Sequence, residues 1–140
     1  MIVRCVETTG DALPITARDP VQGVDADTVF PVARDREYHV YAITVLLGIA
    51  WYYVMDEDGN PWPTWVPAPL FEVVDGSFPP SWRIGYFRFS PDDQYPILSF
   101  PEWAQDHQFY ERLVDGDPVA IEIFARRRAE IEGAVGDGFK

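Results

Sequence analysis

The chain has 140 residues, of which 47% are hydrophobic and 15% aromatic, so its composition excludes a disordered chain and predicts one globular domain. Its formal net charge is −12, from 23 acidic and 11 basic residues. This charge disfavours binding to nucleic acid or to an anionic membrane and favours a cationic partner, although it would also serve solubility alone.

Cysteine content and hydropathy favour a cytoplasmic protein. Cys5 is the only cysteine, so no intrachain disulfide can form, and residues 1–10 lack the apolar segment of a secretory signal. The longest apolar run, residues 40–55, is rich in β-branched and aromatic residues and contains Gly48, which favours two strands over a membrane helix.

The first third of the chain predicts one strand and a long loop. Residues 2–6 alternate in polarity, which predicts a strand with Cys5 facing the core. Glycines and prolines interrupt residues 8–36, so we expect an irregular loop there, with a short strand near 28–32 as an option. A loop of this length is either functional or mobile.

The middle of the chain predicts a hairpin with an acidic tip. Residues 37–47 and 49–55 read as strands, and the acidic turn 56–60 leads into a return strand over 61–66. Prolines 61 and 63 lack backbone N–H groups, so this return strand must lie at a sheet edge or be partly unpaired. Residues 70–74 predict a further strand, or a one-turn helix leading into one.

Residues 81–90 alternate well and predict a strand, and a turn at 91–93 connects it to a last strand over 95–100. One predicted face carries Trp82, Ile84, Tyr86 and Arg88.

Helical spacing replaces strand alternation after Phe100. We predict one helix from Pro101 to Gly116 and a second from Asp117, its N-cap, to Gly133. The predicted fold class is α+β, a mainly antiparallel small β-barrel or half-barrel followed by two C-terminal helices. Residues 1–140 would form a single domain with a β-rich part (1–100), a two-helix part (101–133) and a flexible tail (134–140).

Four segments support a family resemblance. MIVRCVETTG (1–10), the strand containing Tyr38, WYYVMDEDG (51–59) and VPAPLFEVVD (66–75) together resemble small bacterial SH3-like barrel proteins. This resemblance covers residues 1–75 and implies an SH3-like barrel.

By size, negative charge, aromatic content and lack of catalytic motifs, the whole chain also resembles immunity proteins of bacterial polymorphic and contact-dependent toxin systems. That resemblance implies a cytoplasmic protein that binds and blocks a cognate toxin domain.

Catalytic and metal-binding motifs are lacking in the sequence. His39 and His107 lie in no recognisable catalytic setting, and Cys5 is expected in the core. Residues 56–60 have the acids of a calcium loop but not its later glutamate, because Val66 and Pro67 occupy that place. We therefore expect no enzyme activity, no cofactor and no metal.

The acidic residues are concentrated in one region. Residues 37–80 contain six acids and no arginine or lysine, which is half of the net charge. Acids beside exposed tryptophans are typical of a charged rim around an aromatic anchor. The predicted partner-binding residues are therefore Asp56, Glu57, Asp58, Trp62, Trp65, Glu72 and Asp75.

Three functions follow from these observations, in decreasing order of preference. The first is a non-enzymatic immunity protein that occludes a cationic toxin, most concretely a nuclease. The second is a stand-alone SH3-like module that binds peptides or serves as a scaffold. The third, a small hydrolase, is distant. The sequence leaves the oligomeric state open.

Overall fold

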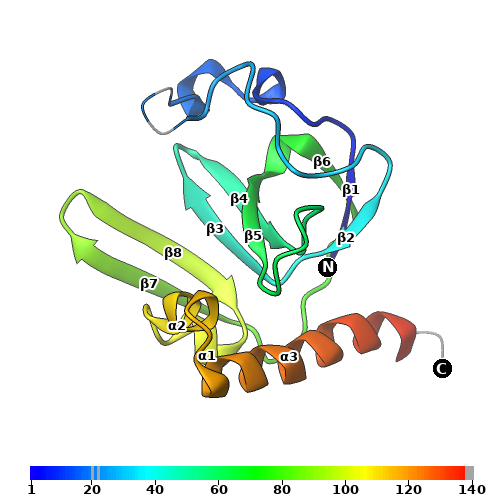
Figure 1. The fold of residues 1–140 in the computed structure, drawn as a ribbon, viewed down its shortest axis with the longest axis vertical. Coiled ribbons are helices and arrows are strands. Elements are labelled where there is room, and N and C mark those ends of the chain that lie inside the picture. Colours follow the sequence, from blue (N-terminus) through cyan, green and yellow to red (C-terminus); the bar gives the residue numbers. More distant parts are fainter. Residues whose placement is uncertain (20, 22, 138–140) are drawn as a thin grey trace. The chain divides into compact units, whose positions relative to one another are not determined.

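A computed structural model of the chain describes residues 1–19, 21 and 23–137 (Figure 1). Its fold is α+β, with two antiparallel sheets and three α-helices in that part of the chain. The backbone divides into two compact units, Met1–Gly76 and Ser77–Lys140. The predicted class is confirmed, but the sheets are open and do not close into a barrel. That both units form one domain stays a prediction.

The first unit contains a three-stranded sheet centred on its first strand. Strand β1 (Ile2–Cys5) lies between β2 (Glu37–His39) and β6 (Phe71–Asp75), antiparallel to both. The alternation in β1 buries Val3 and Cys5 completely, as the sequence predicted.

The same unit contains the strands β3 (Ala42–Leu46), β4 (Ile49–Val54) and β5 (Thr64–Pro67), which pair in that order. The prediction of one strand over residues 37–47 was wrong, because the chain passes from one sheet to the other at Val40 and Tyr41. The Val40 amide donates to the Met1 carbonyl at 3.1 Å, whereas the Tyr41 amide donates to the Tyr53 carbonyl at 2.9 Å. Two successive amides thus bond to different sheets.

The predicted hairpin with an acidic tip is present, but its connection is a loop over residues 55–63 and not a tight turn. Gly59 has the positive φ (79°) expected of it. Strand β5 begins at Thr64 because Pro61 and Pro63 cannot donate to a ladder, and it lies at the sheet edge as predicted. The 3-10 turn η4 (Ala68–Leu70) leads from it into β6.

Residues 8–36 are irregular but held in place. Two short 3-10 turns, η1 (Gly10–Ala12) and η2 (Ile15–Ala17), lie in this segment, and the optional strand near 28–32 is reduced to an isolated bridge between Thr9 and Val29. A Cβ on Gly10 would lie 1.7 Å from the Asp25 carbonyl oxygen, so this close approach requires glycine. Gly10 and Asp25 therefore pack closely against each other within this segment.

The second unit begins with the hairpin of β7 (Arg83–Ser90) and β8 (Asp93–Ser99) (Figure 1). One face of this hairpin packs on α1 (Pro101–Ala104), where the Ala104 carbonyl would lie 1.8 Å from a Cβ on Gly85. Phe87 and Ile97 are buried, whereas Ile84 and Tyr86 are exposed, which agrees with the predicted alternation of β7. Trp82 was predicted on the same face as Ile84 and Tyr86, but it precedes the strand and, unlike them, is buried.

The helical part contains three helices, so the prediction of two was wrong. Its first predicted helix is divided into α1 and α2 (Phe109–Val114). The division lies at Asp106, whose carboxylate accepts a hydrogen bond from the Gln108 amide at 2.9 Å and pairs with Arg112 at 2.7 Å. A side chain that bonds the backbone in this way competes with helical hydrogen bonding.

Helix α3 (Pro118–Asp137) begins as predicted, because the Asp117 carboxylate accepts a hydrogen bond from the Ala120 amide at 3.1 Å. It continues past Gly133, where we had predicted its end, since one helical glycine costs only about 1 kcal/mol. Of the predicted flexible tail, residues 134–137 belong to this helix, and 138–140 lie outside the described residues. None of the described helices combines the length and apolar character needed to span a membrane.

Candidate partner-binding site

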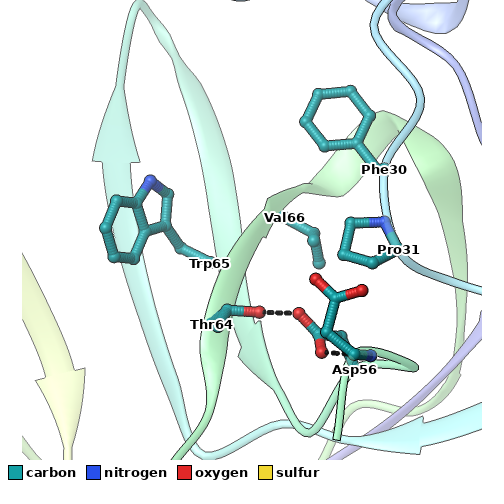
Figure 2. A pocket seen from close by; sticks show the side chains of 7 residues that line it. Phe30, Pro31, Asp56, Thr64, Trp65 and Val66 are labelled. Carbon is teal, nitrogen blue, oxygen red and sulfur yellow. Dashed lines mark hydrogen bonds between the residues drawn. The ribbon is translucent and has the colours of Figure 1, made fainter. Parts of the chain in front are cut away.

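A shallow pocket of about 260 Å³ lies beside the acidic loop of the first unit (Figure 2). Three segments form its walls: the end of the 8–36 segment, the 55–63 loop and strand β5. Its lining residues are Phe30, Pro31, Asp56, Asp58, Thr64, Trp65 and Val66.

Asp56 organises the loop. One oxygen of its carboxylate, Oδ1, accepts a hydrogen bond from the Asp58 amide at 2.9 Å. Its other oxygen, Oδ2, accepts a hydrogen bond from the Thr64 hydroxyl, which Figure 2 shows turned toward it. Asp56 therefore connects the loop to the first residue of β5, and its negative charge lies at the pocket wall.

Glu57 is occupied by internal contacts. Its amide donates to the Pro31 carbonyl at 2.8 Å, and its carboxylate pairs with Arg36 at 2.8 Å and accepts a hydrogen bond from the Tyr38 hydroxyl at 2.7 Å. Burial and the neighbouring Glu57 carboxylate raise the pKa of Tyr38 to about 12. Glu57 is thus a structural acid that holds the 8–36 segment against the loop.

Asp58 and Trp65 are exposed groups at the pocket. The Asp58 carboxylate is exposed, and it has no hydrogen bond or ion pair with the described residues. Trp65 is 45% exposed, and its ring packs on Tyr53 with the ring centres 5.7 Å apart. In Figure 2 it extends away from Phe30 and Pro31, so it borders the pocket without closing it.

The other three predicted site residues lie outside the pocket lining. Glu72, on β6, pairs with Arg4 on the neighbouring strand β1. Asp75 ends β6 opposite Ile2. Trp62 is part of the 55–63 loop and is half-buried. The structure therefore brings together Asp56, Asp58 and Trp65, with Glu57 next to them.

Sequence reasoning missed the opposite wall of the pocket. Phe30 and Pro31 contribute it, although more than twenty residues separate them from Asp56 in the chain. Only the length of the 8–36 segment indicated a possible role.

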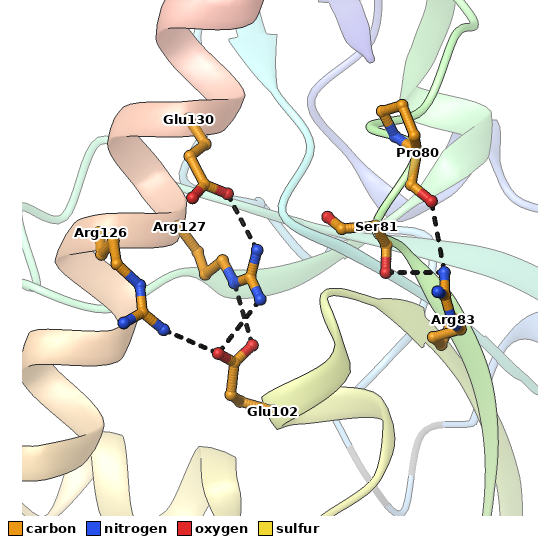
Figure 3. A network of polar contacts seen from close by, with 7 residues as sticks. All are labelled: Pro80, Ser81, Arg83, Glu102, Arg126, Arg127 and Glu130. Atoms are coloured by element: carbon orange, nitrogen blue, oxygen red, sulfur yellow. Dashed lines mark hydrogen bonds and ion pairs between the residues drawn. The ribbon is translucent and has the colours of Figure 1, made fainter.

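A contrasting charged cluster lies in the second unit (Figure 3). The Glu102 carboxylate on α1 pairs with Arg126 at 2.8 Å and with Arg127 at 2.9 Å, both on α3, and Arg127 also pairs with Glu130 at 3.0 Å. Partial burial by itself would raise the pKa of Glu102. The hydrogen bond from Arg127 and the positive charges of Arg127 and Arg126 outweigh burial, so the pKa is lowered. Here acids and bases neutralise one another.

Most arginines are occupied in this way. Seven form ion pairs with acids of the chain: Arg4, Arg34, Arg36, Arg112, Arg126, Arg127 and Arg128. Arg18 and Arg83 donate to backbone carbonyls, and Arg88 lies over the Tyr86 ring at 4.9 Å. The acids that remain, Asp58 among them, therefore set the negative potential at the surface.

The structure also locates the groups considered for catalysis. Cys5 is fully buried, its thiol donates to the Glu7 carbonyl at 3.1 Å, and burial raises its pKa, which disfavours the nucleophilic thiolate. No group of three or more potential metal ligands occurs among the described residues.

No protein-family model matches the chain, and neither a search of curated proteins nor a search of solved structures finds a match.

Proposed function

We propose that this protein is a non-enzymatic binding protein of the immunity type, which acts in the cytoplasm by binding and occluding a cationic bacterial toxin, most concretely a nuclease. The observation that carries the proposal is the pocket lining, which combines two acids, Asp56 and Asp58, with the apolar residues Phe30, Pro31 and Val66. A long cationic side chain has this same combination of a charged head and an apolar stem.

The pocket fits one arginine side chain of the partner. Its guanidinium would lie between Asp58 and Asp56, where a charged hydrogen bond is stronger than a neutral one. Its methylene stem would lie along Phe30 and Val66, and Trp65 would pack against the partner's surface as the aromatic anchor.

The charge of the whole chain would assist this binding. A protein of charge −12 attracts a basic nucleic-acid groove over several ångströms, which raises the association rate at low salt. Bound there, the protein would exclude nucleic acid from that groove. We therefore expect association to slow steeply with added salt, and a salt-independent association rate would contradict the steering mechanism.

A matched pair of peptides tests the pocket. We would titrate a Gly-Ser-flanked peptide with one arginine, and the same peptide with citrulline, while following tryptophan fluorescence. Citrulline has nearly the shape of arginine without its charge, so only the arginine peptide should bind. Equal binding of the two peptides, or binding of neither, would remove the pocket from the proposed interface.

Substitutions then test whether the Asp58 carboxylate pairs with the arginine of the peptide. Asp58→Asn should weaken binding of the arginine peptide about threefold to tenfold, the effect of one partly exposed charge pair. Asp92→Asn changes an exposed acid in the β7–β8 turn and is the matched control, which should bind as the native protein does.

The biological test searches the neighbouring genes for a basic nuclease domain and uses it as the candidate toxin. Co-expression should protect cells from growth arrest, and the combined Asp58→Asn and Trp65→Ala variant should lose that protection while remaining folded. Full protection by this variant would place the interface elsewhere.

An SH3-like peptide-binding module is the second candidate, favoured by the aromatic and proline walls of the pocket next to an acid. SH3 domains bind proline-rich helices in aromatic grooves, and their acids pair with a cationic residue of the ligand. Proline-rich peptides with and without arginine distinguish the two proposals, because only an SH3-like groove requires the prolines. A small hydrolase stays the distant third candidate, with no observation of this structure in its favour.

A further inference from the structure

Strand β7 has an open edge. It has eight residues, and among the described residues it pairs with β8 alone, along one of its two edges. The edge of such a strand presents unpaired N–H and C=O groups to any extended segment. Many proteins protect their edges with proline, lysine or a very short strand, but β7 is long and contains neither residue.

The side chains of this strand are unusually apolar for their exposure. Ile84 is 76% exposed and Tyr86 50% exposed, on the face opposite to the one that packs on α1. Phe89, near the end of the strand, is 46% exposed. A second strand beside β7 would cover part of each of these side chains through cross-strand pairs.

The charge of the hairpin indicates which partner fits. Residues 81–100 contain two arginines and two aspartates, so this segment is neutral in a chain of charge −12. Two copies of the chain therefore repel each other least at this hairpin. Antiparallel pairing also directs the Asp92–Asp93 turn of each copy toward Arg83 of the other, which makes the contact complementary.

The arginines of β7 leave its edge open. Arg83 donates to the carbonyls of Ser81 and Trp82, at 3.1 and 2.9 Å, and Arg88 lies over its own Tyr86 ring. Both charges are thus held along the strand. The neutral hairpin offers a basic partner no net attraction, so this surface is distinct from the proposed toxin-binding pocket.

We propose that β7 pairs antiparallel with β7 of a second copy of this chain, forming a two-fold symmetric dimer through a continuous sheet. Such an interface is isologous, with the same residues contributed by both copies. Backbone hydrogen bonds would provide the pairing, and Ile84 and Tyr86 would contact the partner strand.

Salt and one substitution test the proposal on the full chain. Sedimentation equilibrium should show a mass that approaches twice that of the chain as protein concentration rises. Added salt should strengthen this association, because it screens repulsion between two acidic molecules, whereas it weakens binding of a basic partner. Ile84→Lys should abolish the dimer, and Val119→Lys, at a 63% exposed position on α3, should leave it unchanged.

A cysteine scan tests the geometry. Cysteine would replace Ile84, Tyr86 or Arg88 one at a time, and Cys5 is too buried to interfere. The position nearest the two-fold axis should form an intermolecular disulfide, because paired Cα atoms lie about 4.5–5.5 Å apart. Gln94→Cys, one strand away on β8, should not. A chain that stays monomeric at every concentration and salt would overturn the proposal, as would crosslinking at Gln94→Cys in place of the β7 positions.

Discussion

Two acidic regions of this protein differ in what surrounds their carboxylates. In the second unit, Glu102 lies between Arg126 and Arg127, so its charge is neutralised and holds α1 to α3. In the first unit, residues 37–76 contain six acids and no arginine or lysine. The first arrangement serves stability, whereas the second leaves part of its charge available for a partner, since Glu57 and Glu72 are paired but Asp58 is not paired with the described residues.

The same difference recurs within the acidic loop. Glu57 and Asp58 are adjacent, yet Glu57 is held by Arg36 and Tyr38 whereas the Asp58 carboxylate faces solvent without a partner among the described residues. A count of charges in the sequence cannot separate these two cases. Measurements of stability and of binding can separate them, because each acid should affect only one of the two.

The largest expected change in the free energy of unfolding follows from substitution of Glu102. Glu102→Ala leaves Arg127, whose side chain is only 18% exposed, without its main partner, and should lower the free energy of unfolding by about 2 kcal/mol. Denaturant unfolding measures this loss. The control is Glu132→Ala, which breaks an exposed pair with Arg128 in the same helix and should cost about 0.5 kcal/mol. Equal losses would mean that Glu102 is no more structural than a surface acid.

Acidic pH should destabilise the protein mainly by protonating two carboxylates of the second unit. Despite partial burial, Arg127 lowers the pKa of Glu102, and the Gln108 amide together with Arg112 lowers the pKa of Asp106. A carboxyl group whose pKa is lowered by folding stabilises the fold fully at pH values above its unfolded-state pKa, about 4. This stabilisation is lost as the pH falls through the folded-state pKa. Thermal melts between neutral pH and pH about 3 should show this loss, and Glu102→Gln should reduce it. An unchanged pH dependence in this variant would contradict the assignment.

Alkali should destabilise the protein in part through Tyr38 of the first unit. The pKa of Tyr38 is raised to about 12, so its contribution is complete below the unfolded-state pKa, about 10, and is lost as pH rises toward 12. Tyr38→Phe should cost about 1 kcal/mol at neutral pH, because its hydrogen bonds to Glu57 and Ala33 disappear, and should weaken the alkaline loss. Tyr52→Phe is a suitable comparison, since burial alone raises the pKa of Tyr52.

The smallest effect on stability is expected at Asp58. Asp58→Asn should change the free energy of unfolding by less than about 0.5 kcal/mol, the usual range for exposed side chains, while reducing binding of the arginine peptide. Glu57→Gln should show the reverse, a measurable loss of stability with little direct effect on binding. If both variants behaved alike in both measurements, the division between structural and available acids would be wrong.

Several features were determined by the sequence itself. Alternation predicted β1 and β7, and Asp117 followed by Pro118 predicted the start of α3, because these signals involve residues close together in the chain. The charge distribution identified the 37–80 region as the place to search for a partner site, since it depends on composition alone.

Tertiary structure decided the rest. The break at Val40 and Tyr41 depends on their amides, which bond to Met1, next to β1, and to Tyr53 on β4. The division of the first predicted helix depends on the Asp106 side chain, and the pocket depends on Phe30 and Pro31 meeting the acidic loop. Whether an acid is neutralised depends on which arginine the fold brings beside it: Arg36 reaches Glu57, and no described arginine reaches Asp58. Such pairings join distant parts of the chain, so local sequence carries no signal for them.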